Sequence, residues 1–226
     1  MPLDAMCYSL EASVTAGLGL GLAGYGMVSK ALRHDRRMLL FAAFPLVFSA
    51  HQFVEAAVWL TRNDPVAGQP FRYLYTLIAF TMWPVLTPFA AAYAESNSER
   101  KSLWLTMGGV GFVLAAYLTA KLAGADGIDL SVYRHSLAYD PLFERPPLLA
   151  DFLYLVLTVT PLIFSERRAI NVFGVAVLAT FFVALAANRP AWYSVWCLAA
   201  AVFSLVIAFA IEEERSSDFE EAEVRR

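Results

Sequence analysis

The stretch "SAHQFVEAAVW", residues 49–59, places an imidazole, an amide and a carboxylate within a long apolar run. His51 and Glu55 lie four residues apart, so on a helix the two side chains share one face. Such a face could hold a metal ion, exchange a proton or form the polar wall of a ligand pocket. Gln52 adds an amide to the same turn.

A metal site is the first chemistry that these residues suggest. His51 and Glu55 would supply two ligands from one helix face. A third ligand from His135, Glu11 or Asp151 would give three protein ligands plus water, which is typical of catalytic zinc. The metal would be zinc or iron. The chain contains 3 histidines and no HExxH motif, so the spacing alone does not select a metal centre.

Covalent catalysis is a second alternative. Cys7 paired with His51 or His135 would resemble the activated thiolate of cysteine-dependent hydrolases and transferases. Cys7 and His135 are therefore the candidate catalytic residues. A cysteine can equally be a small apolar residue in a packed interior, and the sequence does not show whether the thiol and an imidazole meet.

A structural network is the third alternative. The acids Glu11, Glu55 and Asp151 would face Arg72 and His51. Buried charges of opposite sign satisfy one another and fix the register of the helices that carry them. A small-ligand site could be built on the same network.

The composition indicates that these residues belong to a membrane protein. The 226 residues are 59% hydrophobic and only 16% charged, whereas soluble domains carry about 25% charged residues. Seven apolar stretches approach the roughly 20 residues that cross a bilayer. Backbone groups in lipid must be paired within their segment, which favours helices. We therefore predict an all-α polytopic fold with seven transmembrane helices, near residues 9–31, 38–61, 72–94, 102–122, 148–165, 169–187 and 191–211.

The predicted domain organisation is simple. Residues 1–211 would form one seven-helix transmembrane domain, and residues 212–226 a charged cytoplasmic tail. The first stretch follows the acidic start "MPLDAMCYSLE". A signal peptide would be basic there, so we expect a mature helix.

The basic residues predict the orientation. If the N-terminus is outside, 11 of the 17 lysines and arginines fall on the inner side, as the positive-inside rule requires. We therefore predict the N-terminus outside and the C-terminus in the cytoplasm.

With this orientation, the acids and bases within the helices gather in their outer halves. Ionisable groups at membrane depth cost about 3 kcal/mol each and usually face a bundle interior or a water-filled cavity. We therefore predict an outward-facing intramembrane polar pocket. Its predicted ligand-binding residues are Glu11, His51, Gln52, Glu55, Arg72, Tyr75 and Asp151.

Three further features concern the shape of the bundle. The connection 124–147 contains "IDLSVYRHSLAYD", whose partial alternation predicts a short hairpin or an ordered lid on the outer side. Gly17 and Gly21 form a GxxxG pair, which allows internal helix packing or a homo-oligomer contact through the first helix. Pro84 and Pro88 should distort the third helix, because proline removes a backbone donor.

Longer motifs support a family resemblance. "MCYSLEAS" at 6–13 and "PLVFSAHQFVEAAVW" at 45–59 are followed by "WPVLTPFAAAYAE" and, late in the chain, "VWCLAAAVFS". The chain resembles a family of uncharacterised bacterial multi-spanning membrane proteins with an MCxSxxAS start and a QxxExxVW motif on the second helix. The resemblance implies a bacterial cytoplasmic membrane location and Met6, not Met1, as the natural start. It marks as motif positions Cys7, Ser9, Ser13, Gln52, Glu55 and Trp59.

The resemblance also bears on the chemistry. The family has glutamine where this chain has His51, which argues against an essential histidine ligand there. We therefore expect a membrane protein that binds or senses a small ligand or a proton. A metal- or cysteine-dependent hydrolase or transferase acting on lipid is the alternative, and a transporter is the third. The acidic pI of about 5.6 argues against a nucleic-acid partner.

Overall fold

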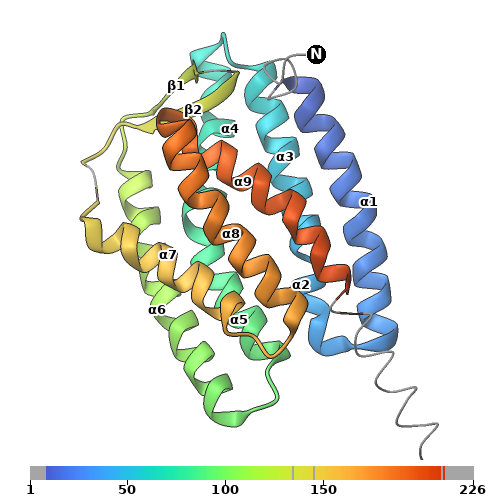
Figure 1. The fold of residues 1–226 in the computed structure, drawn as a ribbon. Helices are drawn as coiled ribbons and strands as arrows, with labels where there is room; N and C mark the ends of the chain where they lie inside the picture. The colour runs from blue at the N-terminus through green and yellow to red at the C-terminus, as the bar shows by residue number, and fades with distance from the viewer. Residues whose placement is uncertain (1–8, 134, 145, 210, 212–226) are drawn as a thin grey trace, which may run out of the picture.

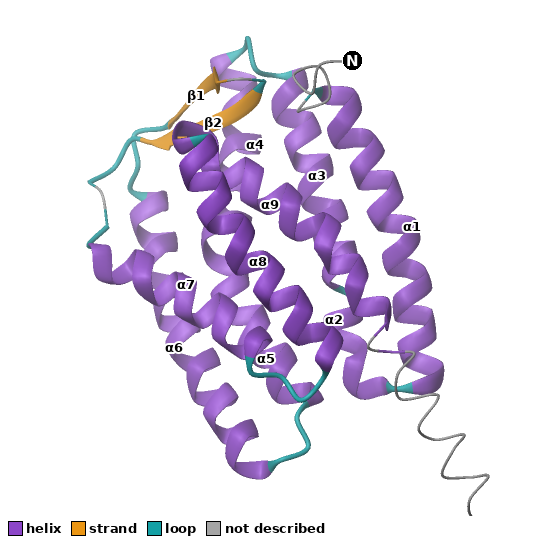
Figure 2. Cartoon of the chain, in the orientation of Figure 1, coloured by secondary structure: helices purple, strands orange, loops and turns teal. Residues whose placement is uncertain are grey.

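A computed structural model describes residues 9–133, 135–144, 146–209 and 211 (Figures 1 and 2). Within these residues, helical segments join end to end into seven helices. They are α1 (Leu10–His34); η2 (Arg36–Met38), α2 (Leu39–Ala42) and α3 (Phe44–Leu60); α4 (Pro65–Leu77), η3 (Ile78–Met82) and α5 (Trp83–Ala94); α6 (Ser98–Ala123); α7 (Leu148–Ile163); α8 (Arg168–Ala187); η4 (Arg189–Ala191), α9 (Trp192–Phe203) and η5 (Ser204–Val206). Cys7 and the predicted tail 212–226 lie outside the described residues.

The helices confirm the predicted all-α class. In the described part of the chain, five are long and apolar enough to cross a membrane: Arg36–Leu60, Pro65–Ala94, Ser98–Ala123, Arg168–Ala187 and Arg189–Phe209. Large apolar side chains also cover the outside of the bundle, with Leu22 77% and Phe112 66% exposed. A contiguous apolar surface of this kind is stable against lipid and not against water, as expected of an integral membrane protein.

The predicted hairpin is confirmed. Strand β1 (Ile128–Tyr133) pairs antiparallel with β2 (Ser136–Pro141), with Leu130 opposite Tyr139. His135 lies in the turn with a positive φ of 65°. The hairpin covers the end of the bundle at which α1 begins (Figure 1), and we call this the hairpin end.

Glycines on α1 allow close contact with α3. A Cβ atom on Gly17 would lie 3.1 Å from the Phe53 ring, and one on Gly21 would lie 3.0 Å from Ser49 Oγ. Ser49 also donates a hydrogen bond to the Gly17 carbonyl at 2.6 Å. Internal packing of the GxxxG pair is therefore confirmed. A homo-oligomer contact through α1 remains a prediction, and it would use the other side of the helix.

The helix that contains Pro84 changes its winding just before the proline. Residues Ile78–Met82 form a π-helical turn, η3, between α4 and α5. Proline cannot donate a backbone hydrogen bond, and wider turns of this kind are one way to accommodate the loss. The Ala79 carbonyl in this turn accepts a hydrogen bond of 2.6 Å from the Tyr154 hydroxyl of α7. The distortion predicted for this helix thus serves to link it to α7.

Charged side chains join the loops at the opposite end. Arg167 pairs with the buried Asp35 at 3.2 Å. Arg100 pairs with Glu95 at 3.2 Å, and the Trp104 indole donates to the same carboxylate. Arg37 also donates to Ser96 Oγ at 2.9 Å, so three connections are held together.

The Glu166 carboxyl also lies beside Glu95, within hydrogen-bonding reach. The hydrogen bond to Glu95 raises the pKa of Glu166 above its usual 4.5. Burial opposes the ionisation of Glu95, but hydrogen bonds from Glu166, the Asn97 amide and the Trp104 indole outweigh it and lower the pKa of Glu95.

We expect this pair to make stability depend on pH. Because the folded state holds the Glu166 proton more tightly than the unfolded state, stability should fall as the pH rises above about 4.5, up to the raised pKa of Glu166. Glu166→Gln keeps a donor and cannot ionise, so melting curves across this range should lose that decline. Glu99→Gln, an exposed acid in the first turn of α6, should keep the wild-type slope; an equal loss there would contradict the assignment.

Candidate functional site

Buried polar residues gather at the hairpin end between α3, α4, α9 and β2. We call this group the His51–Glu55 cluster. Its members are His51, Gln52 and Glu55 of α3, Tyr75 of α4, Tyr139 of β2, and Ser194 and Cys197 of α9, and all of them are buried.

Three rings of the cluster form a stack. The His51 and Tyr75 ring centroids lie 4.2 Å apart with an interplanar angle of 26°. Tyr139 stacks on the other side of Tyr75, also at 4.2 Å, with an angle of 8°. His51 Nε2 lies 3.2 Å from the Tyr75 carbonyl. A carbonyl can only accept, so this nitrogen carries a proton and Nδ1 is the free position of the neutral ring.

Glu55 sits beside this stack. One carboxyl oxygen, Oε2, accepts a hydrogen bond of 3.1 Å from Gln52. The other, Oε1, is buried without a hydrogen-bond partner among the described residues. Ser194 lies next to the carboxyl, accepts a bond of 3.3 Å from the Tyr75 hydroxyl and donates one of 2.8 Å to the Leu137 carbonyl.

Arg72 connects the cluster to the hairpin and pairs with no acid of the described ranges. Its guanidinium donates to the carbonyls of Ile128 and Arg62, each at 3.2 Å. Gln69, one turn earlier, bonds both the amide and the carbonyl of Ile128, at 3.1 and 3.2 Å. The two side chains fasten the first residue of β1 to α4.

An open pocket lies under the hairpin between α6, α7, α8 and α9. Its volume is about 530 Å³, within the range of small-molecule sites. Seven of its sixteen described lining residues are aromatic. The polar residues that line it include Asp140, Asp151 and Arg189, together with Tyr139, Tyr154 and Tyr193.

Tyr139 separates this pocket from the His51–Glu55 cluster. The side chain lines the pocket and also forms the last ring of the stack. Burial raises the pKa of Tyr139 well above its usual value, so the hydroxyl keeps its proton at neutral pH. A ligand that moved this ring would disturb the contacts around Tyr75.

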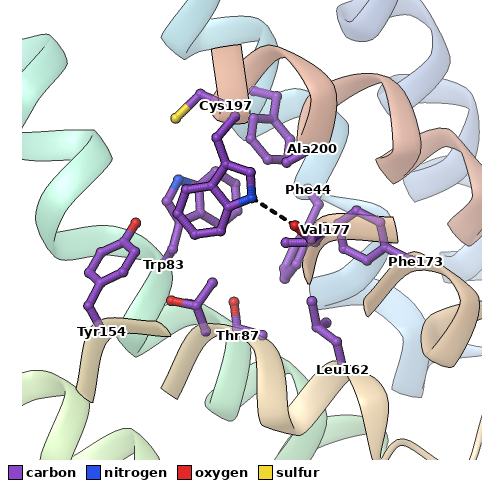
Figure 3. Close-up of a pocket in the computed structure, with 12 residues that line it drawn as sticks. Phe44, Trp83, Thr87, Tyr154, Leu162, Phe173, Val177, Cys197 and Ala200 are labelled. Carbon is purple, nitrogen blue, oxygen red and sulfur yellow. Dashed lines mark hydrogen bonds between the residues drawn. The ribbon is translucent and has the colours of Figure 1, made fainter. Parts of the chain in front are cut away.

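A smaller cavity of about 30 Å³ lies deeper in the bundle. Figure 3 shows Thr87, Tyr154 and Cys197 around it, and the bond of 2.9 Å from the Trp196 indole to the Val177 carbonyl. A space of this size admits about one or two waters. Thr87 and Thr158 are among the residues around it, and their hydroxyls have no partner in the described structure.

The structure brings together some of the predicted ligand-binding residues and not others. His51, Gln52, Glu55 and Tyr75 lie in the cluster, with Arg72 at its edge. Glu11 is exposed in the first turn of α1. Asp151 is exposed on α7 and lines the open pocket. Among the described residues, the alternative of a network that joins Arg72 to these acids is not formed, because both guanidinium hydrogen bonds go to backbone carbonyls.

The predicted catalytic and metal-binding sets are not assembled in the described residues. His135 is exposed in the hairpin turn, whereas His51 and Glu55 are buried. No three His, Cys, Asp or Glu side chains of the described ranges could hold a metal ion together. The pairing of Cys7 with a histidine concerns a residue outside these ranges and stays a prediction.

Three residues of the cluster were absent from the predicted set, namely Tyr139, Ser194 and Cys197. Tyr139 meets Tyr75 only because the hairpin folds back over α4, and Ser194 meets it across the bundle. The alternating pattern of "SLAYD" could have indicated that Tyr139 faces inward. Nothing in the sequence around Ser194 indicates its partners.

No curated protein and no solved structure matches the chain. A family match covers residues 6–222, which is nearly its whole length. The chain therefore belongs to the family of unknown function DUF6629.

Proposed function

We propose that this protein is a membrane receptor or sensor that binds a small organic molecule in the open pocket under the hairpin. The observation that carries the proposal is the position of Tyr139. Its ring forms both a wall of a pocket large enough for a ligand and one end of a stack that continues to Tyr75 and His51. Occupancy of the pocket would thus be transmitted to buried polar groups on α3 and α4.

The lining favours a ligand with an apolar body and a positive charge. Aromatic side chains bind flat apolar groups and attract cations through their ring faces. Among the lining residues that the structure describes, the carboxylates of Asp140 and Asp151 outnumber the guanidinium of Arg189. A protonated aromatic amine combines both properties.

The pocket would open to the outside of a bacterial cytoplasmic membrane. In this proposal all seven helices cross the bilayer, with the N-terminus outside. Basic side chains of the connections at the end opposite the hairpin support it, because lysines and arginines favour the cytoplasmic side; they include Arg36, Arg37, Arg100, Lys101, Arg167 and Arg168. On intact cells, an impermeant maleimide should label Val66→Cys and not Glu99→Cys in a Cys7→Ser background; the reverse pattern would exclude this orientation.

Phenethylamine is a suitable first probe for the pocket. At about 100 times its Kd a ligand stabilises the folded state by about 2.7 kcal/mol, which raises the melting temperature by about 5–10 °C for a chain of this size. We expect such a rise with phenethylamine in detergent-purified protein. Phenylacetate has a similar body and the opposite charge, and we expect no rise with it.

The variants Tyr139→Ala and Tyr133→Ala make a matched pair for this test. Tyr139 lines the pocket, whereas Tyr133 lies on β1 and does not. The stabilisation by phenethylamine should disappear in Tyr139→Ala and persist in Tyr133→Ala. Equal stabilisation in both variants, or by both probes, would rule out the proposed site.

A further inference from the structure

Glu55 lies in a closed site. Its exposed fraction is 1%, and those of its neighbours His51 and Tyr75 are 0% and 1%. Tyr139 covers the side that faces the open pocket, as described above. Whatever satisfies the unpartnered Oε1 oxygen must therefore be very small.

The hydrogen bonds around Glu55 leave Oε1 without a donor. Ser194 has a single proton and gives it to the Leu137 carbonyl. The Tyr75 hydroxyl gives its proton to Ser194, and Gln52 donates to the other carboxyl oxygen. Oε1 is thus a buried acceptor that no described residue serves.

The charges around Glu55 lead to the same conclusion. Arg72, the buried cation of this region, uses its two terminal nitrogens for backbone carbonyls. A buried carboxylate with one hydrogen bond and no ion pair would cost several kcal/mol. A neutral carboxylic acid avoids that cost. The proton of the neutral Glu55 carboxyl can point to Ser194 Oγ. This oxygen keeps one lone pair free after it accepts the hydrogen bond from the Tyr75 hydroxyl.

We propose that Glu55 is a proton-binding site, protonated and neutral while Tyr139 closes the His51–Glu55 cluster. Opening of Tyr139 would admit water from the pocket, and the Glu55 O–H bond would then break with transfer of its proton to that water. The carboxylate left behind would gain hydration and the attraction of Arg72, whose Nε is unpartnered in the described structure. Proton binding would then be coupled to the position of Tyr139.

The neighbours of Glu55 include few groups that titrate. They come from each element packed around the carboxyl: His51 and Gln52 of α3, Tyr75 of α4, Tyr139 of β2, and Ser194 and Cys197 of α9. Arg72 of α4 is the charged group that acts on Tyr139. Neutral His51 already donates to a carbonyl, and it does not supply a second charge. The proposal does not depend on phenethylamine or any other ligand occupying the pocket.

Infrared spectroscopy of the purified protein tests this directly. A protonated carboxylic acid in an apolar site gives a carbonyl band that shifts in D₂O, and we expect one at neutral pH in the wild type. Glu55→Gln preserves a donor at this position, so it should fold and lack the band. Because the pKa of Glu166 beside Glu95 is also raised, the controls are Glu166→Gln and Glu11→Gln, both of which should retain the Glu55 band.

A second variant tests the coupling and does not require removal of the acid. Tyr139→Ala should expose Glu55 to water, so that the band exchanges with D₂O at least ten times faster and disappears at lower pH than in the wild type. Tyr133→Ala should match the wild type. A wild type without the band, a band that survives Glu55→Gln, or unchanged exchange in Tyr139→Ala would each overturn the proposal. If phenethylamine fails to stabilise the protein while the Glu55 band is present, only the proposed ligand site is contradicted.

Discussion

Gly111→Ala is expected to lower the melting temperature by about 6–12 °C, which corresponds to about 3 kcal/mol for a chain of this size. The new Cβ atom would overlap the Pro84 carbonyl oxygen and lie 2.7 Å from its carbon. Both are backbone atoms, so no side-chain rotation can relieve the overlap. Helices α5 and α6 would have to move apart.

Gly109→Ala on the same helix is the matched control. A Cβ atom at this position would meet nothing within 4 Å in the described structure. Alanine favours helix over glycine by about 1 kcal/mol, so this variant should be unchanged or slightly more stable. Thermal melts that show equal stability for the two variants would mean that α5 and α6 do not pack this closely.

The contact at Gly111 also bears on the pocket. Pro84 follows the π-helical turn η3, whose Ala79 carbonyl holds the Tyr154 hydroxyl. Tyr154 lines both the open pocket and the small cavity. Displacement of α5 from α6 should therefore disturb the pocket wall as well as stability.

The sequence predicted the helices well because bilayer thickness sets the length of an apolar segment. The apolar pattern predicts the apolar middle of each helix and not the residues at which the helix begins and ends. The third helix begins at Pro65 and the fourth at Ser98, about seven and four residues before the predicted starts. Polar caps explain both extensions, since Asp64 and Asn97 accept hydrogen bonds from the first free backbone amides.

The candidate site was predictable where its residues are close in sequence. The spacing of His51 and Glu55 was enough to place them on one face of a helix. The stack with Tyr139 was not predictable, because it depends on how the hairpin lies over α4. Contacts between side chains that lie 50 or more residues apart in the sequence leave no local sequence pattern.

Arg72 shows most clearly what composition cannot decide. An arginine near buried acids suggests a salt bridge, and the alternative of backbone carbonyls as acceptors looks the same in the sequence. Its partner Ile128 lies 56 residues away. Only the folded hairpin shows that the Arg72 guanidinium donates its hydrogen bonds to backbone carbonyls.

Arg72→Leu is therefore expected to destabilise the protein by roughly 3 kcal/mol, or about 6–12 °C in melting temperature. The Arg62 carbonyl would lose its hydrogen bond from the guanidinium. The Ile128 carbonyl would keep only the hydrogen bond from the Gln69 side chain. Because Tyr139 lies on the hairpin that these bonds hold, stabilisation by phenethylamine should also be lost. Arg62→Leu is the control: its exposed side chain lies 5.5 Å over the Trp59 ring, a contact worth about 0.5–1 kcal/mol.

A double-mutant cycle separates the backbone role of Arg72 from a salt bridge with Glu55. If the two side chains were an ion pair, Glu55→Gln would remove the partner and make Arg72→Leu much less costly. If Arg72 holds the hairpin through carbonyls and Glu55 is neutral, the two effects should add to within about 0.5 kcal/mol. Chemical or thermal unfolding of the four proteins measures the difference. A coupling above about 1 kcal/mol would mean that Glu55 is charged and paired, and would contradict both the role of Arg72 and the proton on Glu55.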